Sequence, residues 1–531
     1  MNQKPQLSQQ GALLADSLKR IDTYESSLLA HRQKDTIHVP TVGSRLSTAY
    51  EQLRNASEFA ETSLLQQRAI RRYLVRVLSF HTKVSTAHLA EELVAELTQS
   101  EYLANDQTTR SDVKAIDIHI KKYYDAYWDF AATEARAAKR TAFQGWVLDA
   151  LAVHCEQTLR SHLRQLLFAH FAVSYFTGRI RPKKLLKNNE KVVGADMTIV
   201  LYIATHRALL KSDNATIRTA LIDSYQKDVT NLAEFTKFNQ KLDRLFNLKT
   251  TVYATRIVSK NGAALRFIYS GFFAPDAPLT THSLKSPDTL AQGLRQHIEH
   301  EYTELDKRLD TGIIRSVTFL LITKGIIGFA VELPYDMLLY GKLIITPFLI
   351  NLFFPSVFIA LTRLTLSTPG ERNTMAVINH AMSILFANET QDFPIRLQKE
   401  SSSVGFNTMY GVTFLIVFAG LSYLLYRIGF NIVQGGIFFV FLSTASFLSF
   451  RLSRQINELE VVNTPQGSLS LLRDVVYMPF IAVGQWISYR YSQVNIVAMI
   501  LDVLIELPLK TILRLVRQWT QFLNEKKDEL I

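Results

Sequence analysis

The chain has 531 residues, enough for two or three domains, and its mean hydropathy is only slightly positive. Its net charge is +12 and its pI is near 9.4. In a soluble protein this balance would favour a nucleic-acid partner, whereas in a membrane protein it reflects basic cytoplasmic flanks. Cys155 is the only cysteine, which excludes an intrachain disulfide and is compatible with a reducing compartment.

The N-terminal segment, residues 1–43, is rich in Gln, Ser and scattered charges. We expect a loosely ordered tail with one short helix around residues 13–29. Residues 1–10 contain no apolar stretch that could serve as a signal peptide. The soluble part is therefore expected to stay on the side of the membrane where it is made.

Two stretches, residues 44–178 and 195–285, are predicted to form a large helical cytoplasmic domain. Apolar residues recur at spacings of three to five, as between Leu64 and Leu78, which is typical of amphipathic helices. The predicted helices cover residues 89–97, 113–138, 143–176, 197–211 and 215–227, with Gly178 ending the third and Ser212 or Asp213 capping the last. The intervening residues 179–194 are a basic linker, and whether the two stretches form one unit or two stays open.

Residues 250–273 allow two interpretations. Alternating side chains around Asn261-Gly262 are typical of a β-hairpin with a tight turn. Alternatively, Asn261 starts a helix through Ala263, Leu265 and Ile268. The predicted fold class is therefore all-α, with at most one hairpin.

A change in composition near residue 312 separates this domain from a predicted transmembrane domain, residues 313–450. A juxtamembrane helix, residues 286–312, begins at Ser286-Pro287 and can continue unbroken into the first span. Runs of uncharged residues are long enough to cross a hydrocarbon core of about 30 Å. The four predicted spans are residues 313–333, 343–362, 406–426 and 430–450, with a cytoplasmic loop at 363–405. Glu332, Pro334 and Asp336 close the first span.

The distribution of basic residues predicts the orientation of the spans. With the N-terminal domain in the cytoplasm, only Lys342 and Arg427 fall outside. The basic residues that then lie inside or at the inner boundary are Lys307, Arg308, Arg315, Arg363, Arg372, Arg396, Lys399, Arg451, Arg454 and Arg473. Positive charges collect on the cytoplasmic side, so both termini are predicted to be cytoplasmic.

The C-terminal region, residues 451–531, has shorter apolar runs broken by charges. Trp486, Tyr489, Tyr491 and Trp519 are suited to the level of the lipid headgroups. We expect amphipathic helices that lie in the interface or pack under the bundle. A cytoplasmic helical hairpin is the alternative.

Several segments carry a resemblance to known sequences: Leu201–Asp213, Ile322–Lys324 running to Glu332–Asp336, Thr368–Thr374, and Val494 through Ile505–Pro508 to Lys527. They resemble a family of uncharacterised integral membrane proteins of small-genome candidate-phylum bacteria. The resemblance covers most of the chain after residue 44. It implies a helical protein of the bacterial plasma membrane and supplies no catalytic residue.

An intramembrane charge cluster is the first candidate site. Lys324, Glu332 and Asp336 fall in or beside the first span, where a charge costs about 2.5 to 3.5 kcal/mol unless it meets a partner or water. Asp502 and Glu506, one helical turn apart, are the expected partners of Lys324 if the C-terminal helix packs on this span. The cluster is either a structural ion pair or part of an ion or substrate path.

Two further clusters are candidates for ligand binding. The basic linker, with anionic lipid headgroups as the expected ligand and nucleic-acid phosphate as the less favoured one, contains Arg179, Arg181, Lys183, Lys184, Lys187 and Lys191. A metal site is not expected, but the residues that could supply ligands at helical spacing are His297, His300, Glu301 and Glu304. His154, Cys155, His162 and His170 recur at spacings too long for one metal.

No phosphate-binding loop, nucleophile elbow or Cys-x-x-Cys pair occurs in the sequence, so we predict no cofactor and no catalytic residue. The favoured function is a membrane-anchored, non-enzymatic interaction or scaffold protein with an unidentified cytoplasmic protein partner. An ion or small-solute transporter that uses Lys324, Glu332 and Asp336 is the first alternative. A membrane-bound enzyme of lipid or envelope metabolism is the second.

Overall fold

The computed structural model describes residues 7–32, 35–40, 48, 51, 64–177, 179–180, 194–342, 344–366, 368–387, 404–461, 468–493, 515 and 519. Within these ranges the fold is all-helical, as predicted, and the only β-pairing is an isolated bridge between Thr36 and Thr109. The hairpin interpretation of residues 250–273 is wrong. That stretch forms α12 (Lys249–Lys260), α13 (Ala263–Ile268) and a π turn, η3 (Tyr269–Phe273). Its buried residues Thr251, Ala254 and Val258 follow the period of a helix.

The helical domain is built around one apolar core, which includes Phe143 and Phe176 from before the basic linker and Phe235 and Phe273 from after it. Besides α12, α13 and η3, its helices are α1 (Gln9–Arg32), α3 (Leu65–Val77), α4 (Leu89–Gln99), α5 (Arg110–Thr133), α6 (Ala137–Leu159), α7 (Leu163–Thr177), α9 (Gly194–Thr205), the π turn η2 (His206–Leu210), α10 (Asn214–Ser224) and α11 (Leu232–Asn247). As predicted, Asp213 caps α10, because its side chain accepts a hydrogen bond from the Thr216 amide.

The structure also differs from the prediction in residues 143–176 and in the length of the N-terminal helix. Residues 143–176 are not one helix, because the chain leaves the helical conformation between Leu159 and Leu163 and separates α6 from α7. The helix predicted around residues 13–29 of the N-terminal segment is present but longer, because α1 has 24 residues. Its Leu14, Leu18 and Ile21, spaced three and four apart, are buried in the core.

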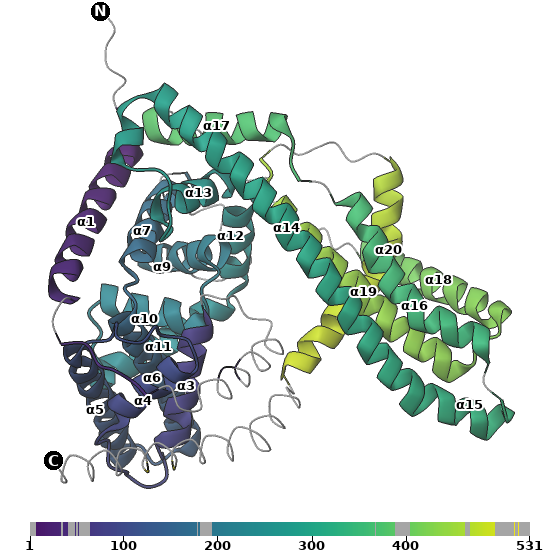
Figure 1. The fold of residues 1–531 in the computed structure, drawn as a ribbon, viewed down its shortest axis with the longest axis horizontal. Helices are drawn as coiled ribbons and strands as arrows, with labels where there is room; N and C mark the ends of the chain where they lie inside the picture. The colour runs from purple at the N-terminus through teal and green to yellow at the C-terminus, as the bar shows by residue number, and fades with distance from the viewer. Residues whose placement is uncertain are drawn as a thin grey trace, which may run out of the picture.

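One helix leads from the helical domain into the apolar bundle (Figure 1). It is α14 (Pro287–Ile327), 41 residues long, and it begins as predicted, with the Ser286 side chain accepting from the Thr289 amide and Pro287 in the first turn. The predicted end at Glu332, Pro334 and Asp336 is wrong. The π turn η5 (Gly328–Glu332) joins α14 to α15 (Leu333–Tyr340), and the helix ends at Gly341, where φ is +64°. Pro334 is tolerated because its missing N–H falls where the regular hydrogen bonding is already interrupted.

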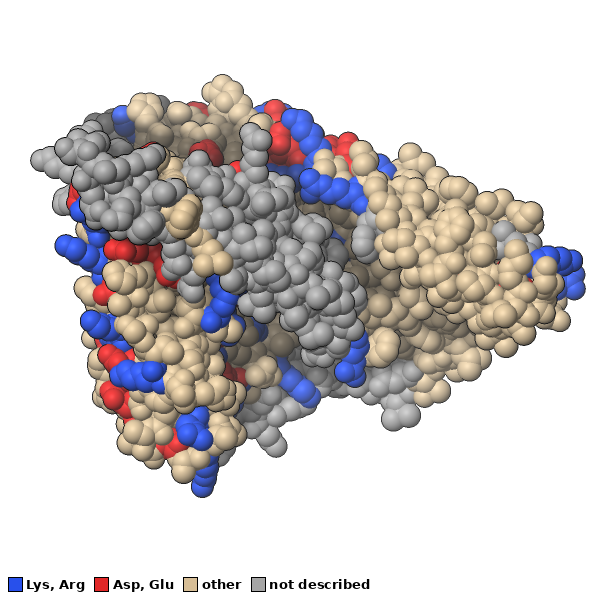
Figure 2. Space-filling view, turned by 60° about the horizontal axis from the view of Figure 1, so that its bottom comes forward, with Lys and Arg blue, Asp and Glu red and all other residues tan. Residues whose placement is uncertain are grey.

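Four helices in the described part of the chain are long and apolar enough to cross a membrane, which confirms the predicted number. They are Pro287–Tyr340, Ile345–Thr362, Thr408–Ile428 and Ile432–Asn457. The last three belong to α16 (Ile345–Thr362), α18 (Val404–Ile428) and α19 (Ile432–Asn457). Figure 2 shows charged side chains gathered over the helical domain, while the bundle presents a mostly uncharged surface. We call this bundle the membrane domain.

The helix after the fourth span, α20 (Ser468–Gln493), packs against α19. The contact is so close that a Cβ atom at Gly484 would collide with the Ser443 carbonyl. Its apolar stretch, Val475–Ser488, is shorter than a span. Of residues 494–531 the structure describes only 515 and 519, so the placement predicted for that part stays a prediction.

The connection between the second and third spans contains a helix that sequence analysis missed. After the short turn η6 (Arg363–Thr365), α17 (Glu371–Phe386) buries Val377, Ala381 and Leu385 in the core of the helical domain. The segment before α1 is bound to the end of α17. Ser8 donates from its amide to the Leu385 carbonyl at 2.9 Å and from its hydroxyl to the Ile384 carbonyl at 2.6 Å. A segment between two spans therefore completes the helical domain.

We expect Ile384→Ala to lower the free energy of unfolding of the helical domain by about 2 to 5 kcal/mol, because it removes a buried side chain from α17. The measurement is denaturant unfolding of the full chain in detergent, followed by the fluorescence of Trp128 and Trp146. Met375→Ala, which truncates a side chain of α17 that is 45% exposed, is the control. Equal stability of the two variants would contradict the placement of α17.

Candidate functional site

A π turn aligns the three charged residues of the first span. In an uninterrupted helix of 3.6 residues per turn, about 80° would separate Lys324 from Glu332, and about 120° would separate it from Asp336. The π turn η5 takes up one extra residue between them, which reduces both angles to about 20°. Lys324, Glu332 and Asp336 therefore share one face of the α14–α15 helix.

Lys324 and Glu332 form a buried ion pair that an amide from another helix completes. They are 2% and 1% exposed, and Lys324 Nζ lies 3.5 Å from Glu332 Oε1. Asn351 of α16 accepts from Lys324 Nζ at 3.0 Å and donates to Glu332 Oε1 at 3.0 Å. The same amide nitrogen lies 3.1 Å from the Gln434 carbonyl oxygen of α19. The Lys324 ammonium also lies 4.3 Å from the centre of the Phe441 ring, a favourable cation–π contact.

Asp336 is held by the start of the fourth span. Asn431 donates to its Oδ1 at 2.9 Å and Gln434 donates to its Oδ2 at 2.8 Å. Asn431 and Gln434 also form a reciprocal cap at the N-terminus of α19. We call Lys324, Glu332, Asp336, Asn351, Asn431 and Gln434 the intramembrane polar network.

The network makes three buried charges compatible with the apolar bundle. Each of them meets an opposite charge or an amide, so the cost of burial is offset. Because the partners come from α14, α15, α16 and α19, the contacts also fix these helices relative to one another. The Oε2 atom of Glu332 is the exception, since it is buried and has no hydrogen-bond partner among the described residues. The carboxylate partner of Lys324 in the structure is Glu332, and Asp502 and Glu506 lie outside the described residues.

The four candidate metal-ligating residues of α14 do not converge. His297 points into the domain and shares a hydrogen bond of 2.7 Å with Ser270. Glu304 pairs with Lys307 at 2.7 Å, and Glu301 lies 3.9 Å from Arg308. Across the described ranges, no group of three or more His, Cys, Asp and Glu side chains could hold a metal ion.

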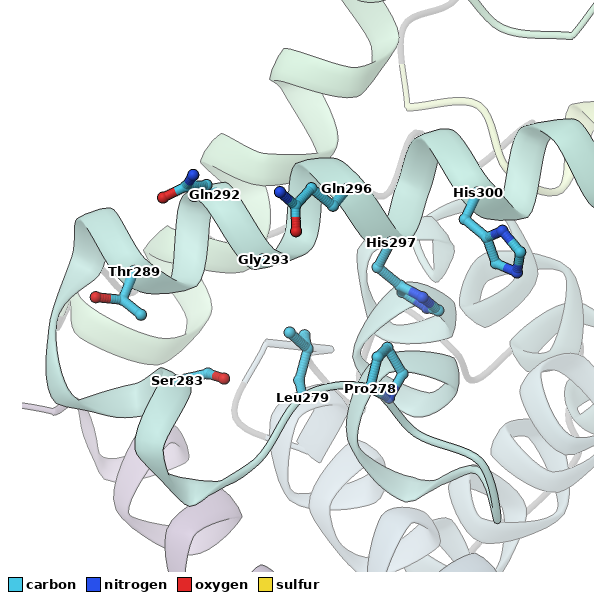
Figure 3. Close-up of a pocket in the computed structure, with 9 residues that line it drawn as sticks. All are labelled: Pro278, Leu279, Ser283, Thr289, Gln292, Gly293, Gln296, His297 and His300. Atoms are coloured by element: carbon cyan, nitrogen blue, oxygen red, sulfur yellow. The ribbon is translucent and has the colours of Figure 1, made fainter.

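His297 and His300 instead line an open pocket of about 440 Å³ between the short helix η4 (Thr281–Lys285) and the first turns of α14 (Figure 3). The other lining residues are Pro278, Leu279, Ser283, Thr289, Gln292, Gly293 and Gln296. Leu279 forms part of the floor and packs against Gly271 and Gly293. The lining carries no carboxylate and no lysine or arginine.

Of the six basic residues of the linker, only Arg179 is described, and its guanidinium lies 3.9 Å from the centre of the Tyr175 ring. Arg181, Lys183, Lys184, Lys187 and Lys191 lie outside the described residues, so lipid binding there stays a prediction. Cys155 is fully buried, and burial raises the pKa of its thiol to about 12. It is therefore not a reactive thiolate near neutral pH.

Sequence reasoning missed the three amide side chains of the polar network. Asn351 lies in the middle of the charge-free second span, where an amide is costly without a partner. Asn431 and Gln434 have the spacing of a helix cap in front of an apolar run. The sequence could therefore have indicated Asn351 and the helix cap formed by Asn431 and Gln434, but it does not reveal which charged side chains these amides bind.

Comparisons with known proteins give no relative: no family model, no curated protein and no solved structure matches the chain. The family resemblance therefore stays a prediction.

We expect Lys324→Met to destabilise the membrane domain by about 3 to 5 kcal/mol, because it leaves the Glu332 carboxylate buried and unpaired. The double variant Lys324→Met/Glu332→Leu should recover most of this loss. Reversible unfolding of the full chain in detergent–lipid micelles measures both, with Ile322→Ala, 59% exposed on the same helix, as the control. No recovery in the double variant would show that the two side chains do not compensate each other.

The stability of the helical domain should depend on pH through His206. Its Nδ1 shares a 3.1 Å hydrogen bond with Ser212, and its Nε2 is buried without a partner among the described residues. Burial, with smaller effects from His170 and His162, lowers the pKa of His206 to about 3. The unfolded state therefore binds the extra proton below about pH 6.5, and the stability due to neutral His206 is lost as the pH falls from there towards 3.

We therefore expect the wild type to lose about 2 kcal/mol of unfolding free energy relative to His206→Gln when the pH is lowered from 7.5 to 5. Denaturant unfolding at the two pH values measures it, and exposed His282→Gln is the control. A difference that does not change with pH would contradict the burial of a neutral imidazole.

Proposed function

We propose that the protein is a non-enzymatic, membrane-anchored interaction protein, which holds a protein partner at a fixed position beside the bacterial plasma membrane. The helical domain would be the binding part and the membrane domain the anchor. The observation that carries this proposal is the position of α17, which lies between two spans in the sequence and inside the core of the helical domain in the structure. A domain attached in this way cannot swing on a flexible tether.

A second attachment at the end of the fourth span supports the same proposal. Glu458, directly after α19, accepts from Lys211 of the helical domain at 2.6 and 2.8 Å. Arg266 lies 3.9 Å from the Glu458 carboxylate and donates to its backbone carbonyl. Asn373 of α17 bonds the following backbone, donating to the Leu459 carbonyl at 2.9 Å and accepting from the Val461 amide at 2.7 Å.

The distribution of basic residues supports a cytoplasmic position for the helical domain. At the junction of the two domains, Arg363 pairs with Asp310 at 2.6 Å and with Asp306 at 3.1 Å, and Arg451 and Arg454 lie on the last turns of α19. Only Lys342 and Arg427 lie at the opposite ends of the spans. By the positive-inside rule, we infer that the helical domain and both termini lie in the cytoplasm, where Arg179 and the basic residues after it would meet anionic lipid.

The test is affinity capture of the tagged full chain from mildly solubilised native membranes after brief crosslinking. We expect at least one soluble protein to be enriched tenfold or more over a tagged four-span membrane protein that lacks the helical domain. The same partner should bind the purified full chain directly. If no protein is recovered above this control, the result contradicts the proposal that the helical domain binds a protein partner.

A further inference from the structure

We propose that Glu332 is a proton-binding site inside the membrane domain, an activity that goes beyond anchoring and does not depend on it. Glu332 Oε1 already accepts from Asn351 at 3.0 Å and lies 3.5 Å from the Lys324 ammonium. Glu332 is only 1% exposed, and its Oε2 has no hydrogen-bond partner among the described residues. A buried carboxylate oxygen without a donor is rare in native proteins, and a bound proton, water or ion accounts for it.

The groups around Glu332 restrict what that ligand can be. Lys324 and Asp336 are the charged groups that share its helix face, and Asn351 faces it from α16. Gln434 of α19 is bonded to both Asn351 and Asp336. Neither α16 nor the part of α19 before Arg451 carries a charged residue.

These neighbours favour a proton over a metal cation. A metal cation needs several oxygen ligands, but Asn351 Oδ1 is taken by Lys324 and both Asp336 oxygens accept from amides. The Lys324 ammonium would also repel it. A proton needs only the free Oε2. It removes the charge of Glu332 and so interrupts the ion pair with Lys324, but it leaves the hydrogen bonds of Asn351 to both side chains in place.

Polar atoms continue from Glu332 towards both ends of the bundle. Towards the α15–α16 turn lie Asn351, Gln434 and Asp336. Towards the helical domain, the hydroxyls of Ser356 on α16 and Ser446 on α19 are buried without partners among the described residues. Beyond them, Ser449 and Thr362 share a 3.1 Å hydrogen bond. In this proposal, water bound at these hydroxyls would carry the proton to Glu332.

The proposed step is a simple protonation. A hydronium ion loses one proton, an O–H bond forms at Oε2, and Glu332 becomes a neutral carboxylic acid without any change of oxidation state. Lys324 keeps its charge, its bond to Asn351 Oδ1 and its contact with the Phe441 ring. Release of the proton restores the ion pair with Glu332.

Infrared difference spectroscopy of the full chain in detergent–lipid micelles tests this step during a pH titration. We expect the wild type to show a carbonyl band of a protonated carboxylic acid that shifts in D2O. The band should lose at least nine-tenths of its intensity in Glu332→Gln. It should persist in Asp106→Asn, whose carboxylate is on the surface of the helical domain.

A band that is unchanged in Glu332→Gln, or no such band in the wild type, overturns the proposal. A midpoint that moves by one pH unit or more when sodium replaces choline also overturns it, because a metal cation would then compete for the site. If Glu332→Gln does not fold, the same titration of Glu332→Asp tests the proposal, because this variant keeps a carboxyl group at the site. A shifted midpoint in that variant supports the assignment, and an unshifted one contradicts it.

Discussion

The charge of Lys324 is the constraint on which the arrangement of the membrane domain depends. An ammonium group in an apolar bundle has to be paired and hydrogen-bonded, and in this chain its carboxylate partner comes from the same helix, eight residues later. Only a π turn brings Glu332 to the same face, and only an amide from α16 completes the pair. The fourth span then holds Asp336 through its own N-terminal cap. Each of these contacts offsets part of the cost of burying a charge.

The helical domain depends on the membrane domain in turn. Its longest helix, α14, continues into the first span. Its core contains side chains of α17, which lies between the second and third spans. Lys211 and Arg266 bind Glu458, the residue after the fourth span. Each attachment uses a different interaction: a continuous helix, an apolar face and an ion pair. Together they connect α14 and α19 to the helical domain at three separate places.

Sequence reasoning identified the class of fold and the number of spans because uncharged runs and helical periodicity are local signals. It also singled out Lys324, Glu332 and Asp336, since charges beside an apolar run are visible without a structure. Their alignment was not predictable, because a π turn changes the helix phase without changing the composition. Asn351 and Gln434 reach the charges from other helices, and this contact is a property of tertiary packing. The break between α6 and α7 contains neither Gly nor Pro, and the polar start of α17, with Arg372, Asn373 and Thr374, resembles a loop.

The contact between the start of the chain and α17 sets an order for biogenesis. Leu14, Leu18 and Ile21 of α1 belong to a core that also needs Ile378, Ala381 and Leu385. During synthesis, the helical domain therefore emerges from the ribosome before the last part of its own core has been made. The missing part follows only after the sequence of the first two spans, which must leave the aqueous phase. Completion of the soluble fold is thus coupled to membrane insertion, and a chain that failed to insert would keep an apolar groove open to chaperones and proteases.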